Sequence, residues 1–125
     1  MENPFFSSRQ MLQFGHRRMA PRVCVVDTKP HIRTFLSEVL EDLGFVVSQC
    51  DRASTVVTAL RSTVPDLIVL GLLAPESDVT KVLRSLASEG YSGKVMLFGG
   101  RASPVLLALH DLGENLRLAM LTPHL

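Results

Sequence analysis

The residues that could do chemistry in this sequence stand directly after its short apolar runs. Each run ends in a carboxylate, a hydroxyl or a glycine, and these ends are Asp27-Thr28, Cys50-Asp51, Gly71, Gly99-Gly100 and Thr122. One carboxylate beside a hydroxyl holds a cation only weakly, because hard cations such as Mg²⁺ need several oxygen ligands. We find no nucleophile paired with a base and no residues at metal-ligand spacing, so the sequence predicts neither an enzyme nor a metal centre.

Three of these positions leave two interpretations open. Asp27 could bind a cation weakly, or it could cap the turn that starts the next helix. Asp51 could accept a phosphoryl group, or it could be a solvated loop acid. Residues 99–103 place two glycines and Ser103 before a helix, so their backbone N–H groups could hold an anion or could simply form a turn. In each case we expect the structural role.

Short apolar runs alternate along the chain with segments of helical periodicity. The runs predict strands at 23–26, 45–47, 66–70, 95–98 and 116–121. The segments between them predict helices at 30–43, 53–60, 78–87 and 104–112, with Gly44, Gly90 and Gly113 placed after three of these. Such alternation builds a parallel sheet with helices on both faces, and its sites lie beyond the carboxyl ends of the strands.

The charge of the chain is balanced as a whole but uneven along its length. The 125 residues carry 13 Lys+Arg and 12 Asp+Glu, and this length fits one domain. Residues 1–22 have four arginines and one acid, net +3, which leaves nine bases and eleven acids, net −2, for the other 103 residues. The first segment also holds Phe5, Phe6 and Phe14, half of the six phenylalanines. We therefore divide the chain into an N-terminal arm, residues 1–21, and a domain, residues 22–125.

The composition also indicates which partners and which cellular compartment to expect. The net charge of +1 gives no reason to expect nucleic acid as a partner. No apolar run approaches the roughly 20 residues that a membrane helix needs. Cys24 and Cys50 form no disulfide framework, so we interpret them as small core residues in a reducing compartment. We expect a cytoplasmic protein with neither a membrane nor a nucleic-acid partner.

Several segments resemble the receiver domain of two-component response regulators, over about residues 22–123. Residues 25–33, VVDTKPHIR, resemble the strand that ends in an acidic pair and is followed by a proline and an arginine. Residues 65–78, PDLIVLGLLAPESD, resemble the stretch around the phosphoryl acceptor, and residues 95–100, VMLFGG, resemble the apolar run that ends in a hydroxyl residue. The resemblance implies a flavodoxin-like (CheY-like) α/β fold, with three α/β/α layers and a five-stranded parallel sheet in the order 2-1-3-4-5. It also implies a role in phosphorelay signal transduction.

The same resemblance implies that the phosphorylation site is degenerate. In the family an aspartate accepts the phosphoryl group, and acids that bind Mg²⁺, a hydroxyl and a lysine offset the negative charge. Here the acceptor position is Gly71, and the second acid, a direct metal ligand in the family, is Thr28. The two switch positions are Gly99 and Thr122, so only Asp27 remains of the acidic pocket. We expect a pseudo-receiver that is not phosphorylated on aspartate, with no cofactor and with Mg²⁺ binding lost or weak.

The family ends in a helix after its fifth strand, and this helix is missing before Leu125. We therefore interpret residues 22–125 as a receiver-like domain that lacks its final helix or is truncated before it. The sheet face that this helix covers in the family should then be covered in another way. The arm, through Phe5, Phe6 and Phe14, a partner subunit or a following domain could do so.

Residues 105–109 are five consecutive apolar residues in a predicted helix, more than one buried stripe requires. We interpret Val105, Leu106 and Leu109, together with the phenylalanines of the arm, as a contact surface; a deeply packed helix would explain them equally well. We expect protein partners, namely a signalling kinase, an output protein or a C-terminal effector domain, and a homodimer. The alternative function is a flavodoxin-like module that binds a small molecule or anion in the space left by Gly71 and at residues 99–103.

Overall fold

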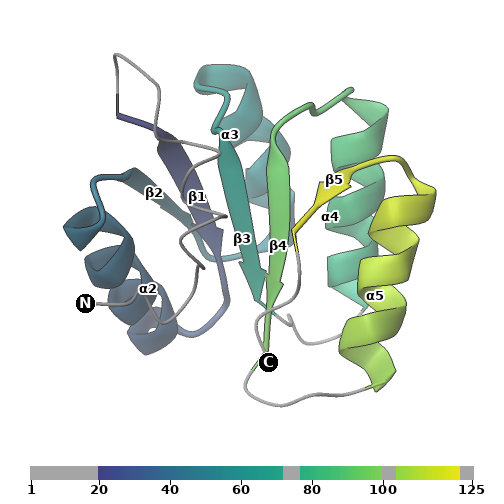
Figure 1. Cartoon of the computed structure of the whole chain (residues 1–125), viewed down its shortest axis with the longest axis horizontal. Coiled ribbons are helices and arrows are strands. Elements are labelled where there is room, and N and C mark those ends of the chain that lie inside the picture. Colours follow the sequence, from purple (N-terminus) through teal and green to yellow (C-terminus); the bar gives the residue numbers. More distant parts are fainter. Residues whose placement is uncertain (1–19, 72–76, 100–103, 122–125) are drawn as a thin grey trace.

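The structure, a computed structural model, describes residues 20–71, 77–99 and 104–121. Helices and strands alternate as β1 (Arg22–Val26), α2 (Pro30–Asp42), β2 (Val46–Cys50), the 3-10 turn η1 (Ala53–Thr55), α3 (Val56–Ser62), β3 (Leu67–Gly71), α4 (Ser77–Ser88), β4 (Lys94–Phe98), α5 (Pro104–Asn115) and β5 (Ala119–Met120). The five strands form one parallel sheet in the order β2-β1-β3-β4-β5 (Figure 1). The predicted flavodoxin-like fold and strand order are confirmed.

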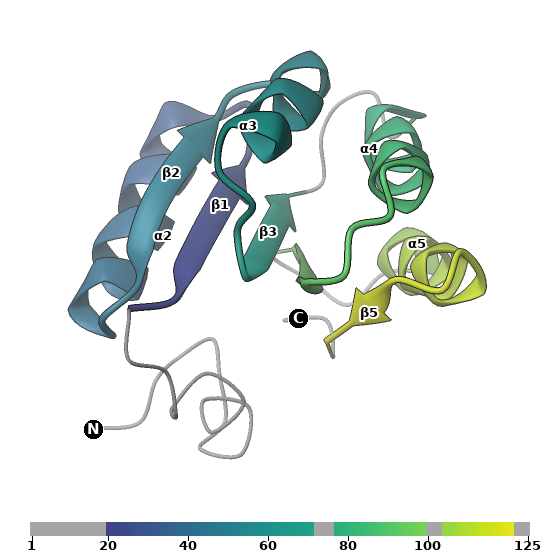
Figure 2. The same ribbon diagram turned by 90° about the horizontal axis from the view of Figure 1, so that it is seen from above.

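The helices lie in two layers, one on each face of the sheet. Figure 2 shows α2 on one face, beside β1 and β2, and α3, α4 and α5 on the other. Two apolar clusters fill the spaces between the layers, one on each side of the sheet. Every residue of β3 is buried, as expected for a central strand that is covered on both faces. None of the described helices is long and apolar enough to span a membrane.

Helix α2 begins and ends where the sequence predicts. Pro30 occupies its first turn, where a missing backbone N–H costs no hydrogen bond. Gly44 follows the helix with φ +95°, a backbone conformation that side-chain-bearing residues rarely adopt. This helix start matters for the site, because the turn before Pro30 carries Asp27.

Strand β2 extends to Cys50, beyond the predicted end at residue 47. Its register with β1 runs from Arg22 opposite Val46 to Val26 opposite Cys50. The polar residues Ser48 and Gln49 hid the strand, because β2 is an edge strand whose side chains are mostly exposed. Apolar alternation is therefore a weak signal at this position.

The end of α5 and the length of β5 differ from the prediction more than the end of β2 does. Gly113 was expected to follow the helix, but α5 continues to Asn115 and buries Gly113. A Cβ atom at this glycine would lie 2.4 Å from the Sδ of Met120, so the glycine serves close packing against β5. Strand β5 spans only Ala119–Met120 instead of 116–121, because Leu118 N–H donates to the Gly113 carbonyl and Arg117 has a φ of 65°. Residues 116–118 therefore form the turn that ends the helix.

We predict that Ser37→Ala stabilises the protein. Ser37 lies in α2 and is 3% exposed, and its buried hydroxyl has no hydrogen-bond partner among the described residues. Removing a buried unpaired hydroxyl and gaining helix propensity should together raise the free energy of unfolding by about 1 kcal/mol. Urea denaturation measures this change, and Ser88→Ala, on an exposed position of α4, reports helix propensity alone. An equal effect of both substitutions would contradict the prediction.

Candidate functional site

The carboxyl edge of the sheet brings two of the predicted site residues into contact. Asp27 directly follows β1, and Gly71 is the last residue of the neighbouring strand β3. A Cβ atom placed on Gly71 would lie 2.1 Å from Oδ2 of Asp27 and 2.9 Å from its Cγ. The Asp27 carboxylate therefore occupies the space that any side chain at position 71 would need.

The backbone around Asp27 holds this carboxylate in place. Its Oδ1 accepts a hydrogen bond of 2.8 Å from the backbone N–H of Lys29, in the turn before α2. The backbone N–H of Asp27 donates to the carbonyl of Cys50 in β2 at 3.1 Å. Nη1 of Arg33 donates to the Asp27 carbonyl at 2.8 Å. Asp27 thus ties the ends of β1, β2 and α2 together, which is the structural role expected for it.

This arrangement contradicts the expected open space beside Gly71. The alternative function required that the loss of a side chain at this position leave room for a small molecule or anion. Asp27 is only 4% exposed, and its carboxylate fills that room. Because this volume is filled, the geometry argues against a ligand site directly beside Gly71.

The other predicted site positions lie apart from this pair or outside the described residues. Thr28 is exposed, and Gly99 is buried directly after β4. Thr122 lies outside the described residues, as do residues 100–103, so the predicted anion loop is described only at Gly99. Around Gly71, the described residues offer a carboxylate from Asp27 alone.

Asp51 has the character of a loop acid. Both of its carboxylate oxygens accept hydrogen bonds of 3.1 Å from the neighbouring Arg52, and both side chains are largely exposed. The hydrogen bond from the Arg52 guanidinium lowers the pKa of Asp51, so this acid is ionised at neutral pH. These contacts support the interpretation of Asp51 as a solvated acid and not as a substitute acceptor.

Three residues near the site have contacts that the sequence analysis did not find. Arg33 reaches from α2 to the Asp27 carbonyl, and its Nε also donates to Oε1 of Gln49 at 3.3 Å. The only signal was the arginine of the VVDTKPHIR segment, whose target the spacing does not identify. Cys24 and Cys50 were predicted as separate core residues, and the register of β1 with β2 brings their Sγ atoms within 3.5 Å.

The two buried thiols are chemically distinct. A hydrogen bond from the thiol of Cys24 lowers the pKa of Cys50 to about 6, although burial opposes this change. The same interaction, together with burial, raises the pKa of Cys24. The carbonyl of Cys50 accepts the hydrogen bond from Asp27, so this thiol pair is joined to the site through the backbone.

The predicted contact surface on α5 is only partly exposed. Leu106 is fully buried and Leu109 is 8% exposed, and both belong to the core beneath the helix. Helical periodicity turns these two residues inward, so their assignment to the surface is corrected. Val105 is 38% exposed, and Leu107, not predicted individually, is 50% exposed. Phe5, Phe6 and Phe14 lie outside the described residues.

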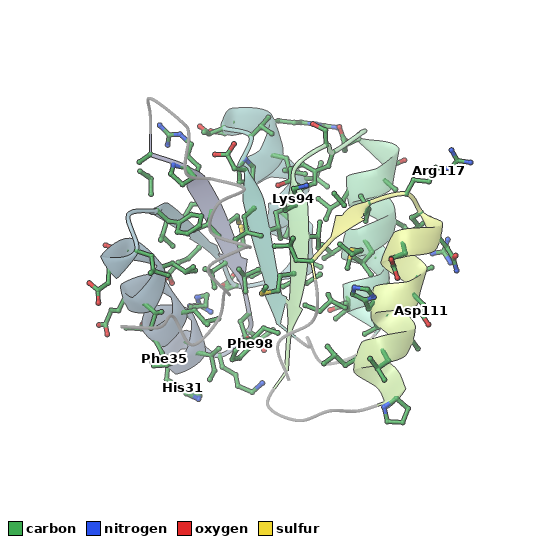
Figure 3. The ribbon with its side chains drawn as sticks, in the orientation of Figure 1. His31, Phe35, Lys94, Phe98, Asp111 and Arg117 are labelled. Atoms are coloured by element: carbon green, nitrogen blue, oxygen red, sulfur yellow. The ribbon has the colours of Figure 1, made fainter. Side chains whose placement is uncertain are left out.

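One cluster of potential metal ligands occurs on the described residues, on the surface of α5. His110, Asp111 and Glu114 place ligand atoms within 4.8 Å of one another, and Nδ1 of His110 lies 3.3 Å from Oε1 of Glu114. Figure 3 shows Asp111 on the outer side of this helix. An exposed acidic group at helical spacing commonly occurs without an ion, and we assign it no metal.

A family model described as the response regulator receiver domain matches residues 23–115. The CAI-1 autoinducer sensor kinase/phosphatase CqsS of Vibrio cholerae serotype O1 is 29% identical over 105 residues, which are 82% of this chain and 15% of that protein. The DNA-binding response regulator MtrA of Mycolicibacterium smegmatis is 37% identical over 70 residues, 54% of this chain and 31% of that protein. This chain therefore spans less than a third of either relative.

Solved structures share the fold. A response regulator from Colwellia psychrerythraea has a TM-score of 0.72 at 24% identity, with 83% of this chain and 82% of that chain covered. The chemotaxis protein CheY4 of Vibrio cholerae has a TM-score of 0.66 at 19% identity, with coverage of 82% and 83%. At these identities the structures establish the architecture alone.

We predict that the costs of changing Gly71 and Asp27 are coupled. Gly71→Ala should lower the free energy of unfolding by about 1–3 kcal/mol, because the new methyl group overlaps the Asp27 carboxylate. In an Asp27→Ala background the nearest Asp27 atom left is its Cβ, 3.3 Å away, so the same change should cost less. Urea denaturation of the wild type, both single variants and the double variant measures the coupling. Equal costs in both backgrounds would show that the carboxylate does not fill this space.

We also predict that Cys50 ionises near pH 6 in the folded protein. Because the Cys24 thiol lowers the pKa of Cys50, the ultraviolet absorbance of the thiolate should grow at a lower pH than that of an ordinary cysteine. Cys24→Ala removes the donating thiol and should move this transition toward higher pH. The transition should vanish in Cys50→Ala, and its persistence there would assign it to another group.

Proposed function

Because the chain belongs to the response regulator receiver domain family, we propose that it is a receiver that signals through protein contacts and not through phosphorylation of an aspartate. One observation carries this proposal: the acceptor position is Gly71, and the Asp27 carboxylate fills the space beside it. Glycine has no nucleophile that could form an acyl phosphate. A phosphoryl group brought to this edge would also lie beside the buried carboxyl group of Asp27.

The residues present do not fit the Mg²⁺ ion that phosphoryl transfer in this family requires. Hard cations are held by several oxygen ligands, and carboxylates are the strongest of these. Asp27 is the one acid at the site, and its Oδ1 already accepts the hydrogen bond from Lys29. The second acidic position is Thr28, whose neutral hydroxyl cannot replace a carboxylate. We propose that Mg²⁺ binding is weak or lost and that no cofactor takes part, so no step of the function passes through a metal.

The function we propose is that of a binding module in a two-component pathway, without enzymatic activity. The two relatives are named as a sensor kinase/phosphatase and a DNA-binding response regulator. We infer that the partner of this chain is a signalling kinase, an output protein or a C-terminal effector domain, in the cytoplasm. Val105 and Leu107 are exposed apolar side chains of α5, and we propose that this helix contributes to the contact surface for such a partner or for a second copy.

We predict that the full chain is not phosphorylated. Incubation with acetyl phosphate and Mg²⁺, followed by intact-mass spectrometry, should give no phosphoryl adduct, because no aspartate stands at the acceptor position. A receiver with an aspartate at that position serves as the positive control. A phosphoryl adduct on the wild-type chain that disappears in Asp51→Asn or Asp27→Asn would contradict the proposal.

We predict that Leu107→Asp disrupts self-association and leaves the fold intact. Leu107 is half exposed, so a charge there should cost little stability but should weaken an apolar interface. Light scattering over a range of protein concentrations should give a dimer for the wild type and a monomer for the variant. Val64→Asp is the matched control, because Val64 is also an exposed apolar residue, 64% exposed, and lies outside α5. Unchanged mass in Leu107→Asp would remove α5 from the interface.

A further inference from the structure

The two cysteines of the chain lie side by side in the core, on neighbouring strands of the sheet. Cys24 of β1 pairs with Ser48, and Cys50 lies two residues further along β2, so the cysteines stand diagonally across this pair of strands. Alternate residues of a strand point to the same face, and both side chains belong to the apolar cluster under α3 and α4. Their Sγ atoms lie 3.5 Å apart, and both thiols are free. The strand register therefore creates a buried dithiol.

This dithiol is close to the geometry of a disulfide bond. The sulfur atoms of a disulfide lie about 2.0 Å apart, so the Sγ atoms of Cys24 and Cys50 need to approach by about 1.5 Å. Diagonally placed residues are further apart than directly opposed ones, so part of this approach has to come from the backbone. Formation of the bond therefore moves one of the two strands locally.

The end of β2 is the part that can move. Cys24 is the middle residue of β1, which pairs with β2 on one side and with β3 on the other. Cys50 is the last residue of β2, an edge strand that pairs with β1 alone among the described strands (Figure 1). The next two residues, Asp51 and Arg52, are exposed. Fewer contacts hold Cys50 than hold Cys24, so Cys50 moves toward Cys24.

The two thiols also have the complementary roles that oxidation requires. The hydrogen bond from the Cys24 thiol lowers the pKa of Cys50, and the same contact and burial raise the pKa of Cys24. Cys50 is therefore the thiolate, which is the form that oxidants attack, and Cys24 stays a thiol beside it. Cys50 is 6% exposed, which favours a small oxidant such as hydrogen peroxide over a bulky disulfide.

We propose that Cys24 and Cys50 are a redox-active pair, which hydrogen peroxide converts to a disulfide that displaces the Cys50 carbonyl from the Asp27 amide. First, the Cys50 thiolate attacks one oxygen of the peroxide, the O–O bond breaks, hydroxide leaves, and Cys50 becomes a sulfenic acid. Then the sulfur of Cys24 attacks the sulfur of Cys50, the S–O bond breaks, and the hydroxyl group leaves with the Cys24 proton as water. The peroxide gains the two electrons that the sulfur atoms lose.

The disulfide has a route to the carboxyl edge of the sheet. The backbone N–H of Asp27 donates to the Cys50 carbonyl at 3.1 Å, so a shift of Cys50 acts on the residue that follows β1. The carboxylate of Asp27 in turn accepts the hydrogen bond from Lys29 in the turn before α2. This chemistry does not require phosphorylation or its absence, so it stands independently of the function proposed above.

Peptide mapping of the full chain tests whether the bond forms. After brief treatment with hydrogen peroxide and digestion with trypsin without reductant, we expect peptides 23–33 and 34–52 to be joined and lighter by two hydrogen atoms than the two reduced peptides together. Dithiothreitol should separate them. Denaturing electrophoresis without reductant should show a single chain. Unjoined peptides, or chains linked to one another, would overturn the proposal.

Two variants test which thiol reacts. In Cys24→Ala no second thiol is present, so dimedone should trap the sulfenic acid on Cys50. In Cys50→Ala the remaining Cys24 should be oxidised about tenfold more slowly than the thiols of the wild type, because Cys24 is not the thiolate. Oxidation of Cys24 in this variant at the wild-type rate would overturn the assignment of Cys50 as the reacting residue.

Amide hydrogen exchange of the reduced and the oxidised wild-type chain tests the effect on the strand end. We expect the amide of Asp27 to exchange about tenfold faster after oxidation, because its acceptor has moved. The amide of Lys94, which donates to the Asp66 carbonyl on the other side of β3, is the internal control and should not change. Peroxide-treated Cys24→Ala is the matched control, because it is oxidised without forming the bond. Equal exchange of the Asp27 amide in the reduced and disulfide forms would overturn the displacement.

Discussion

The carboxyl edge of this sheet is organised around one steric exclusion. In its present position the carboxylate of Asp27 fills the volume that a side chain at position 71 would need, so a larger residue there would require this carboxylate to move. In a parallel sheet the ends of neighbouring strands are the usual place for a ligand site, since the loops leave room there. Here the backbone of Lys29 fixes the carboxylate inside that room. Among the described residues of this edge, the polar groups of Asp27 connect the strand end to β2 and to the turn before α2.

Hydrogen bonds connect Asp27 to the neighbouring strand and helix. Asp27 links β1 to β2 through the Cys50 carbonyl, and Arg33 links the same residue to α2 and to Gln49. Cys50 also contacts Cys24 through its sulfur, inside the apolar cluster under α3 and α4. A change in the state of either thiol would therefore act on the strand end where Asp27 is held. These contacts lie in the β1–β2 half of the molecule, whereas α5 packs beside α4 and β5.

The sequence was sufficient to predict the architecture and the type of each long element. Continuous apolar runs identified β1, β3 and β4 because these strands are buried, and the residues around Pro30 and Gly44 defined α2 through their backbone preferences. The edge strands were harder, since β2 carries polar residues and β5 is only two residues long. Gly113 was misjudged because the same residue type ends helices and permits close packing, and only the position of Met120 distinguishes the two.

For the site, the motif positions identified Asp27 and Gly71 as neighbours. They did not show whether the space beside Gly71 is empty or filled. The absent side chain of Gly71 suggested an empty space, whereas the carboxylate of Asp27 occupies it. Likewise, the run of apolar residues at 105–109 indicated an interface without showing which of them point inward. Side-chain volume and strand register decide these questions, and both depend on residues distant in the sequence.

The contact between Asp27 and Gly71 also restricts the mutational paths open to this domain. A side chain introduced at position 71 would require the Asp27 carboxylate to move, so the change would act on the hydrogen bond that this carboxylate accepts from the Lys29 backbone. Removing the Asp27 carboxylate first would free the space but would break the turn into α2. Substitutions at positions 27 and 71 therefore act on the same small volume, and the effect of changing one depends on the residue present at the other.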